Sequence, residues 1–582
     1  MMERNGGSII GEELARAGIR SLFTLCGGHI SPILTGAKAQ GIRVVDMRDE
    51  VSAVFAADAV ARMTGVPGVA AVTAGPGVTN TVTAVKNAQM AQSPVLIFGG
   101  ATATVLKGRG SLQDIDQLAL MGPITKWATS VNKVSALAPT VARALEIARS
   151  GVPGPVFVEV PVDLLYPESL VHDWFMKESG VANAKGLGAK ALELYLKGHL
   201  LRQFHAPHVQ LPLPIPELRL PRLGVGDRVE EVAALLRRAE RPAIIVGSQA
   251  LVNSREPERI ADALRSLGAP VWLGGMARGL LGQRSELQFR HKRSAALKEA
   301  DVVIVAGFPF DFRLGYGRSI SKKATLAAAN LSRTDLHKNR EPELALEMHA
   351  GDLLVQLAAR LGDPPQRWEG WFETLRAREE ARDAEIAAKG EAGEGRINPI
   401  HFFHRLEEKM DPSAVMVVDG GDFVATAAYI VRPRAPLSWL DPGVFGTLGV
   451  GGGFATGAAV VRPESEIWLI YGDGSSAYSL AEFDTYVRHG LAPIAVIGTD
   501  GSWAQIAREQ VEILGDDIGT VLRRTDYHRV AEGYGGIGLL LEDPAKVDEI
   551  LEEAKAHARA GRPVCLNVQI ESSDFRKGSI SM

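Results

Sequence analysis

The sequence predicts an α/β protein made of three doubly wound domains, each built on a parallel sheet. First, apolar runs such as 68-GVAAVTAG-75 and 494-IAVIGTDG-501 are continuous rather than alternating, which is typical of strands covered on both faces. Second, segments with helical periodicity separate these runs, as crossovers between parallel strands require. Third, a chain of 582 residues has room for three or four domains at roughly 100–200 residues each.

Residues 1–180 are predicted to form the first domain. Its strands are expected at 43–45, 68–75 and 94–100, and the domain closes with the strand 154-GPVFVEVPVD-163. Residues 181–224 are predicted to form a linker, whose Pro-rich run 207–221 must be largely extended. Within it, residues 190–204 have apolar residues at helical spacing, so they form either a helix packed on the body or a helix lying on a membrane surface.

The central domain is predicted for residues 225–365, with a helix and a buried strand over 229–250 and another strand over 301–309. The charge-rich segment 366–394 is expected to be a solvated helix and loop. Residues 395–570 form the third predicted domain, with strands at 415–421, 466–475, 494–501 and 563–569. A tail, residues 571–582, follows and is predicted to close over the site as a lid. The first and third domains end alike, in 153-PGPVFVEV-160 and 561-GRPVCLNV-568, which suggests a common origin.

Composition and charge exclude several classes of protein. Hydrophobic residues make up 46% of the chain, too many for a disordered protein. The 64 basic and 68 acidic residues give a net charge of −4, which offers no electrostatic basis for nucleic-acid binding. With two cysteines, neither a disulfide framework nor a cysteine zinc site is expected. No secretory signal or run of about 20 apolar residues is visible, so a cytoplasmic protein without a membrane span is predicted.

The segment that begins 472-GDGSSAYS-479 contains the clearest chemical motif. A strand ends at Gly472, and a helix is expected over 479–490. Backbone N–H groups at Gly474 and Ser475 would form an anion site beside the Asp473 carboxylate. Such a pairing holds a diphosphate through a divalent cation, and Mg²⁺ prefers oxygen ligands of this kind.

A second carboxylate, Asp500, follows Asp473 by 27 residues, at the end of the next predicted strand. The two side chains would therefore lie at the carboxyl ends of neighbouring parallel strands, where ligands bind in open α/β sheets. The alternative is that Asp473 only caps its helix. The second Asp favours the metal-ligand interpretation.

At this point the sequence resembles the thiamine-diphosphate enzymes, essentially over its whole length. The resemblance implies pyrimidine-binding, central and diphosphate-binding domains in that order. It implies Mg²⁺ held by the side chains of Asp473 and Asp500 and by the backbone carbonyl of Ser502, with Gly472, Gly474, Ser475 and Trp503 around the diphosphate. The chain departs from the family in two places, because Asp500 replaces the usual Asn and follows Thr499. The extra negative charge implies either tighter Mg²⁺ binding or a nearby compensating donor.

The same resemblance assigns residues to the thiamine ring. The run 46–65 places on Glu50 the carboxyl group that faces N1′ of the aminopyrimidine, although a helix N-terminal acid favoured by the macrodipole is the alternative. The run 73-TAGPGVTN-80, with Gly75 and Asn80, matches the turn beneath the cofactor.

Two glycine-rich runs of the third domain complete the implied cofactor site. In the run 443–459, the Gly446 carbonyl would accept from the 4′-amino group, and Leu448 would be the apolar wedge under the bent cofactor. Gly420, Gly421 and Asp422 resemble the loop that flanks the diphosphate. Because Glu50 and this site belong to different domains that meet across a subunit interface in this family, a homodimer or homotetramer is implied.

The reaction is suggested by runs outside the cofactor motifs. The run 108–128, which contains Gln113, resembles both acetolactate synthases and 2-hydroxyacyl-CoA lyases. The run 26-CGGHISP-32 places His29 in the active-site loop, as an acid/base or as a residue that only hydrogen-bonds. The runs 195–204, 499–510 and 574–582 most resemble the lyases, which implies cleavage of a 2-hydroxyacyl-CoA to formyl-CoA and an aldehyde or ketone.

Other functions stay open at this point. A carboligase acting on pyruvate, like acetolactate synthase, is the main alternative. A non-catalytic cofactor-binding subunit is disfavoured by the presence of Glu50, and a metal-dependent phosphohydrolase would leave the first domain unexplained. The central domain is implied to hold FAD, an ADP or CoA moiety, or nothing. Arg278, Arg313 and Arg318 are the candidates to meet nucleotide phosphates, although surface or helix-capping roles are equally open.

Overall fold

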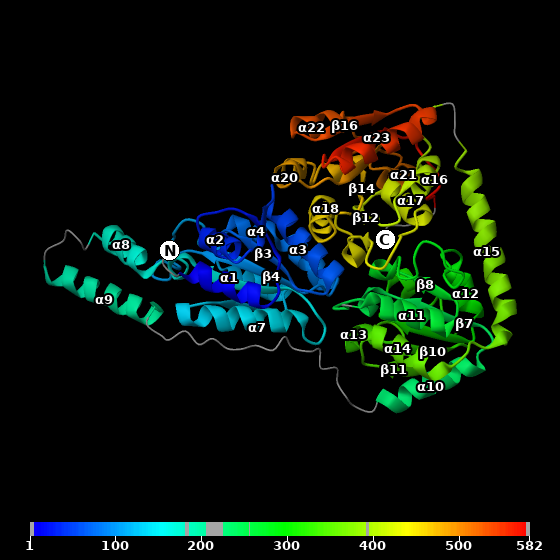
Figure 1. The fold of residues 1–582 in the computed structure, drawn as a ribbon, viewed down its shortest axis with the longest axis horizontal. Coiled ribbons are helices and arrows are strands. Elements are labelled where there is room, and N and C mark those ends of the chain that lie inside the picture. The colour runs from blue at the N-terminus through cyan, green and yellow to red at the C-terminus, as the bar shows by residue number, and fades with distance from the viewer. Residues whose placement is uncertain (1–4, 181–185, 205–224, 255, 392–394, 578–582) are drawn as a thin grey trace. The chain divides into compact units, whose positions relative to one another are not determined.

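The computed structural model describes residues 5–180, 186–204, 225–254, 256–391 and 395–577. The chain forms two compact units, one of residues 1–61 and 66–218 and the other of residues 62–65 and 219–582 (Figure 1). The predicted fold class is confirmed, because three parallel sheets covered by helices occur in the order expected.

The first unit contains a six-stranded sheet with the strand order β2-β1-β3-β4-β6-β5, in which all pairs are parallel. Strands β3, β4 and β6 are buried along their whole length, which explains their continuous apolar sequences. The elements are α1 (Gly6–Arg16), β1 (Ser21–Leu25), α2 (Ser31–Ala39), β2 (Arg43–Asp46), α3 (Glu50–Thr64), β3 (Gly68–Val72), α4 (Pro76–Asn80), α5 (Val82–Met90), β4 (Val95–Ala101), α6 (Gln117–Met121), β5 (Trp127–Ser130), α7 (Leu137–Arg149), β6 (Val156–Pro161), α8 (Glu168–Glu178) and α9 (Leu187–Phe204).

The central sheet, in the second unit, has the order β11-β10-β9-β7-β8 and is also parallel throughout. Its elements are α10 (Val225–Arg238), β7 (Pro242–Val246), α11 (Pro257–Leu267), β8 (Val271–Leu273), α12 (Arg293–Glu299), β9 (Val302–Ala306), β10 (Thr325–Ala329), α13 (Arg333–Leu336), β11 (Leu344–Leu346), α14 (Ala350–Leu361) and α15 (Glu369–Ala388).

The third sheet, also in the second unit, has the order β13-β12-β14-β15-β17-β16. If the strands of each sheet are numbered from its own first strand, the first and third sheets have the same order. The topology therefore supports the common origin that the similar sequence endings of the two domains suggest. Its elements are α16 (Pro399–Lys409), β12 (Val415–Val418), α17 (Asp422–Ile430), β13 (Trp439–Leu440), α18 (Val450–Val461), β14 (Ile467–Gly472), α19 (Asp473–Ser476), α20 (Glu482–His489), β15 (Ile494–Thr499), α21 (Ala504–Leu514), α22 (Tyr527–Gly533), β16 (Ile537–Leu541), α23 (Val547–Arg559) and β17 (Val564–Gln569).

The two predicted linkers have different outcomes. The helix expected within 366–394 exists as α15, but one face is not solvated, because Trp371, Phe372 and Leu375 are buried in the central core. The helix expected in the first linker is α9, which packs on the first unit through Leu196 and Leu200. The Pro-rich run 207–221 lies outside the described residues.

The tail is described only to residue 577. There, the Phe575 ring packs edge-on against Tyr429 at 5.7 Å between centroids. The proposed lid role of residues 571–582, like the domain boundaries, stays a prediction. Among the described helices, none is both long and apolar enough to cross a membrane.

Candidate active site

Glu50 is the first residue of α3 and is buried, with 6% of its surface exposed. Its Oε2 accepts a hydrogen bond of 3.0 Å from the Asn80 side-chain amide at the end of α4. Gly77 borders the other oxygen, since a Cβ added there would lie 3.4 Å from Oε1. Glu50, which the resemblance assigns to N1′, and Asn80, which it assigns to the turn beneath the cofactor, are thus in direct contact.

Gly75, Gln113 and His29 gather at the same edge of the first sheet, beyond the carboxyl ends of β1 and β3. Gly75 has φ +59°, and a Cβ there would fall 2.8 Å from the Gln113 carbonyl oxygen, so this close approach needs glycine. The His29 Nδ1 lies 3.3 Å from the Thr73 hydroxyl. Burial lowers the pKa of His29, so its ring is neutral near pH 7 and can accept a proton.

Gln117 is a buried residue of this edge that the sequence did not single out. Its Oε1 accepts from the Gly75 backbone N–H at 3.0 Å, and its Nε2 donates to the Glu159 carboxylate at 2.8 Å and to the Gly100 carbonyl at 3.0 Å. Lys107 and Ser130 also donate to Glu159. Gln117 therefore holds the turn at Gly75 in place. It belongs to a buried network in which its side-chain oxygen and nitrogen both have hydrogen-bond partners.

Asp473 lies at the junction of β14 and α19 and is 2% exposed. Its two carboxylate oxygens accept from the backbone N–H groups of Gly474 at 2.9 Å and Gly501 at 2.8 Å. Burial raises the pKa of Asp473, while these two hydrogen bonds oppose the shift. The carboxylate thus joins the ends of β14 and β15, the two strands predicted to carry the metal ligands.

Asp500 follows β15, and its Oδ1 accepts from the Ser502 backbone N–H at 3.0 Å. Burial, and then the negative charge of Asp473, raises the pKa of Asp500 to about 7. Arg524 lowers the pKa of both carboxyl groups and donates to the Thr499 carbonyl at 2.6 Å. Arg524 therefore offsets part of the negative charge of Asp473 and Asp500, and the sequence did not single it out.

The turn after β14 differs in detail from the prediction. A one-turn helix, α19, starts at Asp473, and the longer helix α20 begins only at Glu482 rather than at 479. The Ser475 hydroxyl closes the turn, because it accepts from the Gly472 N–H and donates to the Gly472 carbonyl, each at 3.1 Å. A Cβ on Gly474 would fall 2.6 Å from the Trp503 ring, so the close packing of Trp503 on this backbone needs glycine.

The predicted diphosphate loop ends at Gly421, which has φ +117° and precedes α17. Asp422 begins the helix, and its Oδ2 pairs with Arg508 at 2.6 Å. Its Oδ1 is buried and has no hydrogen-bond partner among the described residues. An orphaned acceptor beside a loop of this kind fits a site that a polar ligand completes.

The two glycine-rich loops of the third domain are joined by Leu448 and by Asp419. A Cβ on Gly420 would fall 2.3 Å from the Leu448 side chain, so the predicted wedge lies on the diphosphate loop, and Gly446 adopts φ +65° just before it. Asp419, which the sequence did not single out, accepts from the backbone N–H groups of Gly449 at 3.0 Å and Gly451 at 2.7 Å.

Asp419 is predicted to make stability pH-dependent. Burial raises the pKa of Asp419 to about 7 from an ordinary value of 3.8. The protonated carboxyl group therefore makes its full contribution to the free energy of unfolding below about pH 4. This contribution is lost as the pH rises to about 7. The loss is at most about 4 kcal/mol. Asp419→Asn cannot ionise. We therefore expect urea unfolding to show wild type losing stability relative to this variant between pH 4 and 7. A constant difference across that range would contradict the assignment.

The donor set fits Mg²⁺ and thiamine diphosphate. Two carboxylates and a backbone carbonyl are the hard oxygen ligands that Mg²⁺ prefers, and a cation there would relieve the repulsion between Asp473 and Asp500. The backbone N–H groups at the start of α19 lie beside these ligands and suit an anion.

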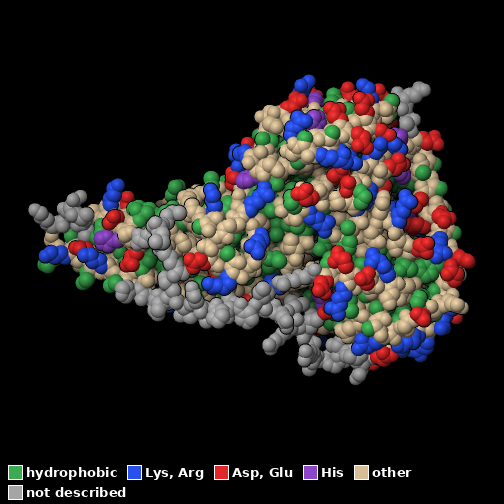
Figure 2. Space-filling model, viewed as in Figure 1, with side chains coloured by type: hydrophobic (Ala, Val, Ile, Leu, Met, Phe, Trp, Pro, Cys, Tyr) green, Lys and Arg blue, Asp and Glu red, His purple; other side chains and the backbone are tan. Residues whose placement is uncertain are grey.

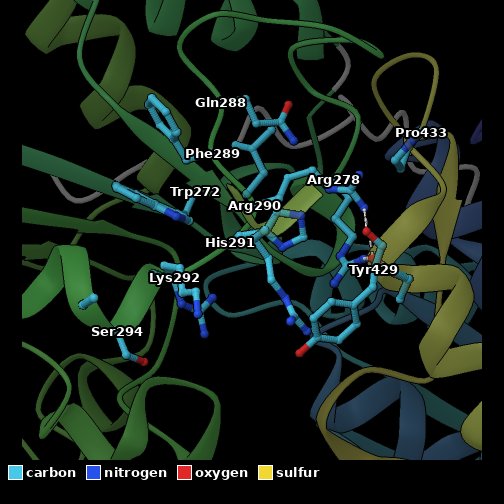
Figure 3. Close-up of a pocket in the computed structure, with 15 residues that line it drawn as sticks. Trp272, Arg278, Gln288, Phe289, Arg290, His291, Lys292, Ser294, Tyr429 and Pro433 are labelled. Carbon is cyan, nitrogen blue, oxygen red and sulfur yellow. Dashed lines mark hydrogen bonds between the residues drawn. The ribbon is translucent and has the colours of Figure 1, made fainter. Parts of the chain in front are cut away.

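A pocket of about 630 Å³ lies between the central and third domains of the second unit (Figure 3). Its basic residues come from the loop after β8 and from α12 and α15, and its aromatic residues are Trp272, Phe289 and Tyr429. The basic residues are Arg278, Arg290, Lys292, Arg293 and Arg382. Burial, and then the charges of Arg432 and Arg278, lowers the pKa of Arg290 to about 10. Crowded positive charges of this kind favour a polyanionic ligand.

Two of these arginines also hold α17. Arg290 donates to the carbonyls of Tyr429 at 2.7 Å and Ile430 at 3.1 Å, and Arg278 donates to that of Ala428 at 3.0 Å. These bonds cap the carboxyl end of the helix whose first residue is Asp422. The pocket and the diphosphate loop therefore lie at opposite ends of one helix.

The other two predicted phosphate-binding arginines are not among the residues that line this pocket. Arg313 pairs with Asp311, at 2.6 Å between Nη2 and Oδ2, and stacks on the Phe308 ring. Arg318 donates to the Gly315 carbonyl at 3.3 Å. Only Arg278 of the three lines the pocket.

Comparison with known proteins identifies the family. The description "Thiamine pyrophosphate enzyme, N-terminal TPP binding domain" matches residues 4–120, the central domain of the same enzymes matches 229–357, and the C-terminal TPP binding domain matches 419–568. The chain is 48% identical to 2-hydroxyacyl-CoA lyase 2 of Danio rerio, over all of this chain and 94% of that protein. It is 45% identical to 2-hydroxyacyl-CoA lyase 2 of Homo sapiens, over all of this chain and 92% of that protein.

Acetolactate synthases are more distant relatives. The large subunit IlvG of Mycobacterium tuberculosis is 33% identical, over 98% of this chain and 96% of that protein. Each of the three matches falls on a different one of the three sheets, and the first and third matches contain Glu50 and Asp473. The chain therefore belongs to the thiamine pyrophosphate enzymes, in the family that contains 2-hydroxyacyl-CoA lyase 2 and the acetolactate synthases.

Proposed function

We propose that this protein is a thiamine-diphosphate- and Mg²⁺-dependent 2-hydroxyacyl-CoA lyase, which cleaves the C1–C2 bond of its substrate to formyl-CoA and an aldehyde or ketone. The observation that carries the proposal is the full-length similarity, at 45–48% identity, to proteins named 2-hydroxyacyl-CoA lyase 2. The placement of Glu50 and Asp473 in the two cofactor-binding domains supports it.

The cofactor, when bound, supplies the nucleophilic carbon and the electron sink that C–C bond cleavage needs. Glu50 would hold the proton shared with N1′ of the aminopyrimidine, with Asn80 fixing its carboxylate. Asp473, Asp500 and the Ser502 carbonyl would hold Mg²⁺ against the diphosphate, with the Gly474 N–H orienting the Asp473 carboxylate.

His29 and Gln113 would act on the substrate. A neutral His29 ring can take the proton of the 2-hydroxyl group as the C1–C2 bond breaks. Gln113 would donate to the same hydroxyl oxygen, from the loop held against Gly75.

The basic pocket would hold the nucleotide end of coenzyme A. Lys292, Arg293 and Arg382 supply positive charge for the phosphates, and Trp272 or Tyr429 offers a ring for adenine. FAD is the other candidate for this pocket, and a flavin absorption spectrum of the purified protein distinguishes the two.

Removing two of these charges is expected to weaken substrate binding. In the double variant Lys292→Gln/Arg382→Gln we expect the KM for acyl-CoA to rise roughly tenfold or more, because each charged hydrogen bond contributes about 1.5–3 kcal/mol. We expect kcat to stay near the wild-type value, since the pocket lies away from the carboxylate cluster at Asp473. Steady-state kinetics check this, with Arg318→Gln, outside the pocket lining, as the matched control. An unchanged KM would mean that the nucleotide does not bind in this pocket.

Acetolactate synthesis from pyruvate is the second candidate, favoured by the relatives at 33% identity. Mass spectrometry of the products separates the two. Purified protein with thiamine diphosphate and Mg²⁺ receives either a panel of 2-hydroxyacyl-CoAs or pyruvate. Formyl-CoA with the matching aldehyde or ketone supports the lyase. Acetolactate from pyruvate alone would overturn it.

The assembly is proposed to be a homodimer or homotetramer, as the family implies, in which Glu50 of one copy serves the diphosphate site of another. The protein is proposed to work in the cytoplasm. Sedimentation and cell fractionation test these two points separately.

A further inference from the structure

Helix α9 has two apolar faces, and the first unit covers only one. Leu196, Leu200 and Gln203 are buried, and the two leucines join the small core formed with Val171 and Phe175 of α8. On the other side, Leu187, Leu194 and Leu201 are 89%, 74% and 52% exposed. Steps of seven residues place these three leucines in one row, with Ala191 and Gly198 between them.

The two faces lie on opposite sides of the helix. At about 100° per residue, the Leu187–Leu194–Leu201 row is centred roughly 180° from the buried Leu196. Packing on the body therefore explains one apolar face and leaves the other unexplained. A surface helix in water normally presents polar residues there.

The charges along the exposed row identify what would cover it. Lys190, Lys197 and Arg202 are exposed on its two sides, and Glu193, paired with Lys197 at 2.6 Å, is the acidic residue of this helix. If α9 of a second copy packed on the row, these cations would face one another, because residues beside such a seam meet their counterparts in either orientation. Positive charge beside leucines instead complements an anionic apolar boundary.

We propose that the outer face of α9, the row Leu187–Leu194–Leu201 with its basic borders, docks on an anionic lipid surface. The leucines would enter the boundary between headgroups and acyl chains, and Tyr195, 51% exposed on the same helix, would lie at headgroup level. Figure 2 shows hydrophobic, basic and acidic side chains interspersed on the part of the surface formed by α8 and α9. The acidic residues Glu168, Asp173 and Glu178 belong to α8, so the positive character is confined to α9. This inference does not depend on the reaction that the enzyme catalyses.

Vesicle binding of the full-length protein tests the proposal. Co-sedimentation would use vesicles of phosphatidylcholine alone or with about one-third phosphatidylglycerol. We expect wild type to bind the anionic vesicles at least tenfold more strongly than the neutral ones and to be released by salt. The variant Leu187→Ser/Leu194→Ser/Leu201→Ser is expected to lose at least tenfold in binding. Lys190→Glu/Arg202→Glu should lose the preference for anionic lipid.

Two controls keep the result unambiguous. Ile513→Ser/Leu514→Ser changes two equally exposed apolar residues of α21, at 73% exposure each, and should bind as wild type does. Thermal melting should show that the leucine variant stays folded at the assay temperature, since the three leucines are mostly exposed. Full vesicle binding by that variant, or no binding by wild type, would overturn the proposal. So would a smaller particle mass of the variant in light scattering, which would assign the row to a second copy.

Discussion

Glu50→Gln is expected to lower kcat by roughly 10²–10⁴-fold while thiamine diphosphate still binds, because the glutamine cannot exchange a proton with the aminopyrimidine ring. The substitution keeps the size of the side chain, and its carbonyl oxygen can still accept from Asn80. Fold and cofactor affinity should therefore change little. Turnover of the 2-hydroxyacyl-CoA, measured beside calorimetric binding of thiamine diphosphate with Mg²⁺, checks both halves of the expectation.

Glu13→Gln is the matched control for this experiment. Glu13 is also a buried glutamate of the first unit, 5% exposed, and it pairs with Arg16 on α1. Its replacement should leave kcat within about twofold of wild type, because it lies in no predicted site. If Glu50→Gln retained wild-type turnover, Glu50 would be only a helix N-terminal acid, and the catalytic assignment would be lost.

Asp473→Asn is expected to weaken Mg²⁺-dependent binding of thiamine diphosphate by roughly 100-fold or more, since replacing even a supporting group around a metal costs 10–100-fold. Both Asp473 oxygens accept backbone N–H groups, from Gly474 and Gly501. An amide has one acceptor oxygen, so it would turn an NH₂ group toward one of these donors. Calorimetric titration with the cofactor, at saturating Mg²⁺, measures the loss.

Asp500→Asn provides the comparison for that variant. It keeps a hard oxygen ligand, restores the residue usual in the family and removes one charge from a crowded pair. We expect its affinity to stay within about tenfold of wild type. Wild-type affinity in Asp473→Asn would mean that this carboxylate does no more than cap α19.

Most interior strands were predictable from the sequence, whereas most edge strands were not. The edge strand β2, predicted at 43–45, and the interior strand β1, which was missed, are exceptions. Runs such as 68–75 and 494–501 mark β3 and β15, which are buried along their length. β5 and β16 are edge strands with mostly half-buried residues, so they lack a continuous apolar run, and β13 has only two residues. β10 is also a buried strand, but its small residues, TLAAA, do not form a strongly apolar run that would predict it.

The site was predictable where its residues follow strands. Asp473 and Asp500 end neighbouring strands, and topology alone brings such positions together. Gln117, Asp419 and Arg524 were missed because their roles depend on partners distant in the sequence. The basic pocket could not be predicted from the sequence either, because segments from two domains line it.

The last strand of the first sheet and the last strand of the third sheet each occupy an interior position. β6 lies between β4 and β5, and β17 lies between β15 and β16. On the ribosome, β16 is therefore made before its neighbour β17 and lacks a pairing partner until residues 564–569 have followed it. A chain stopped before Val564 would leave β15 with an unpaired edge in the middle of a sheet, an exposed template for aggregation. Loss of this one strand of six residues should consequently be as damaging to assembly as the loss of a whole domain.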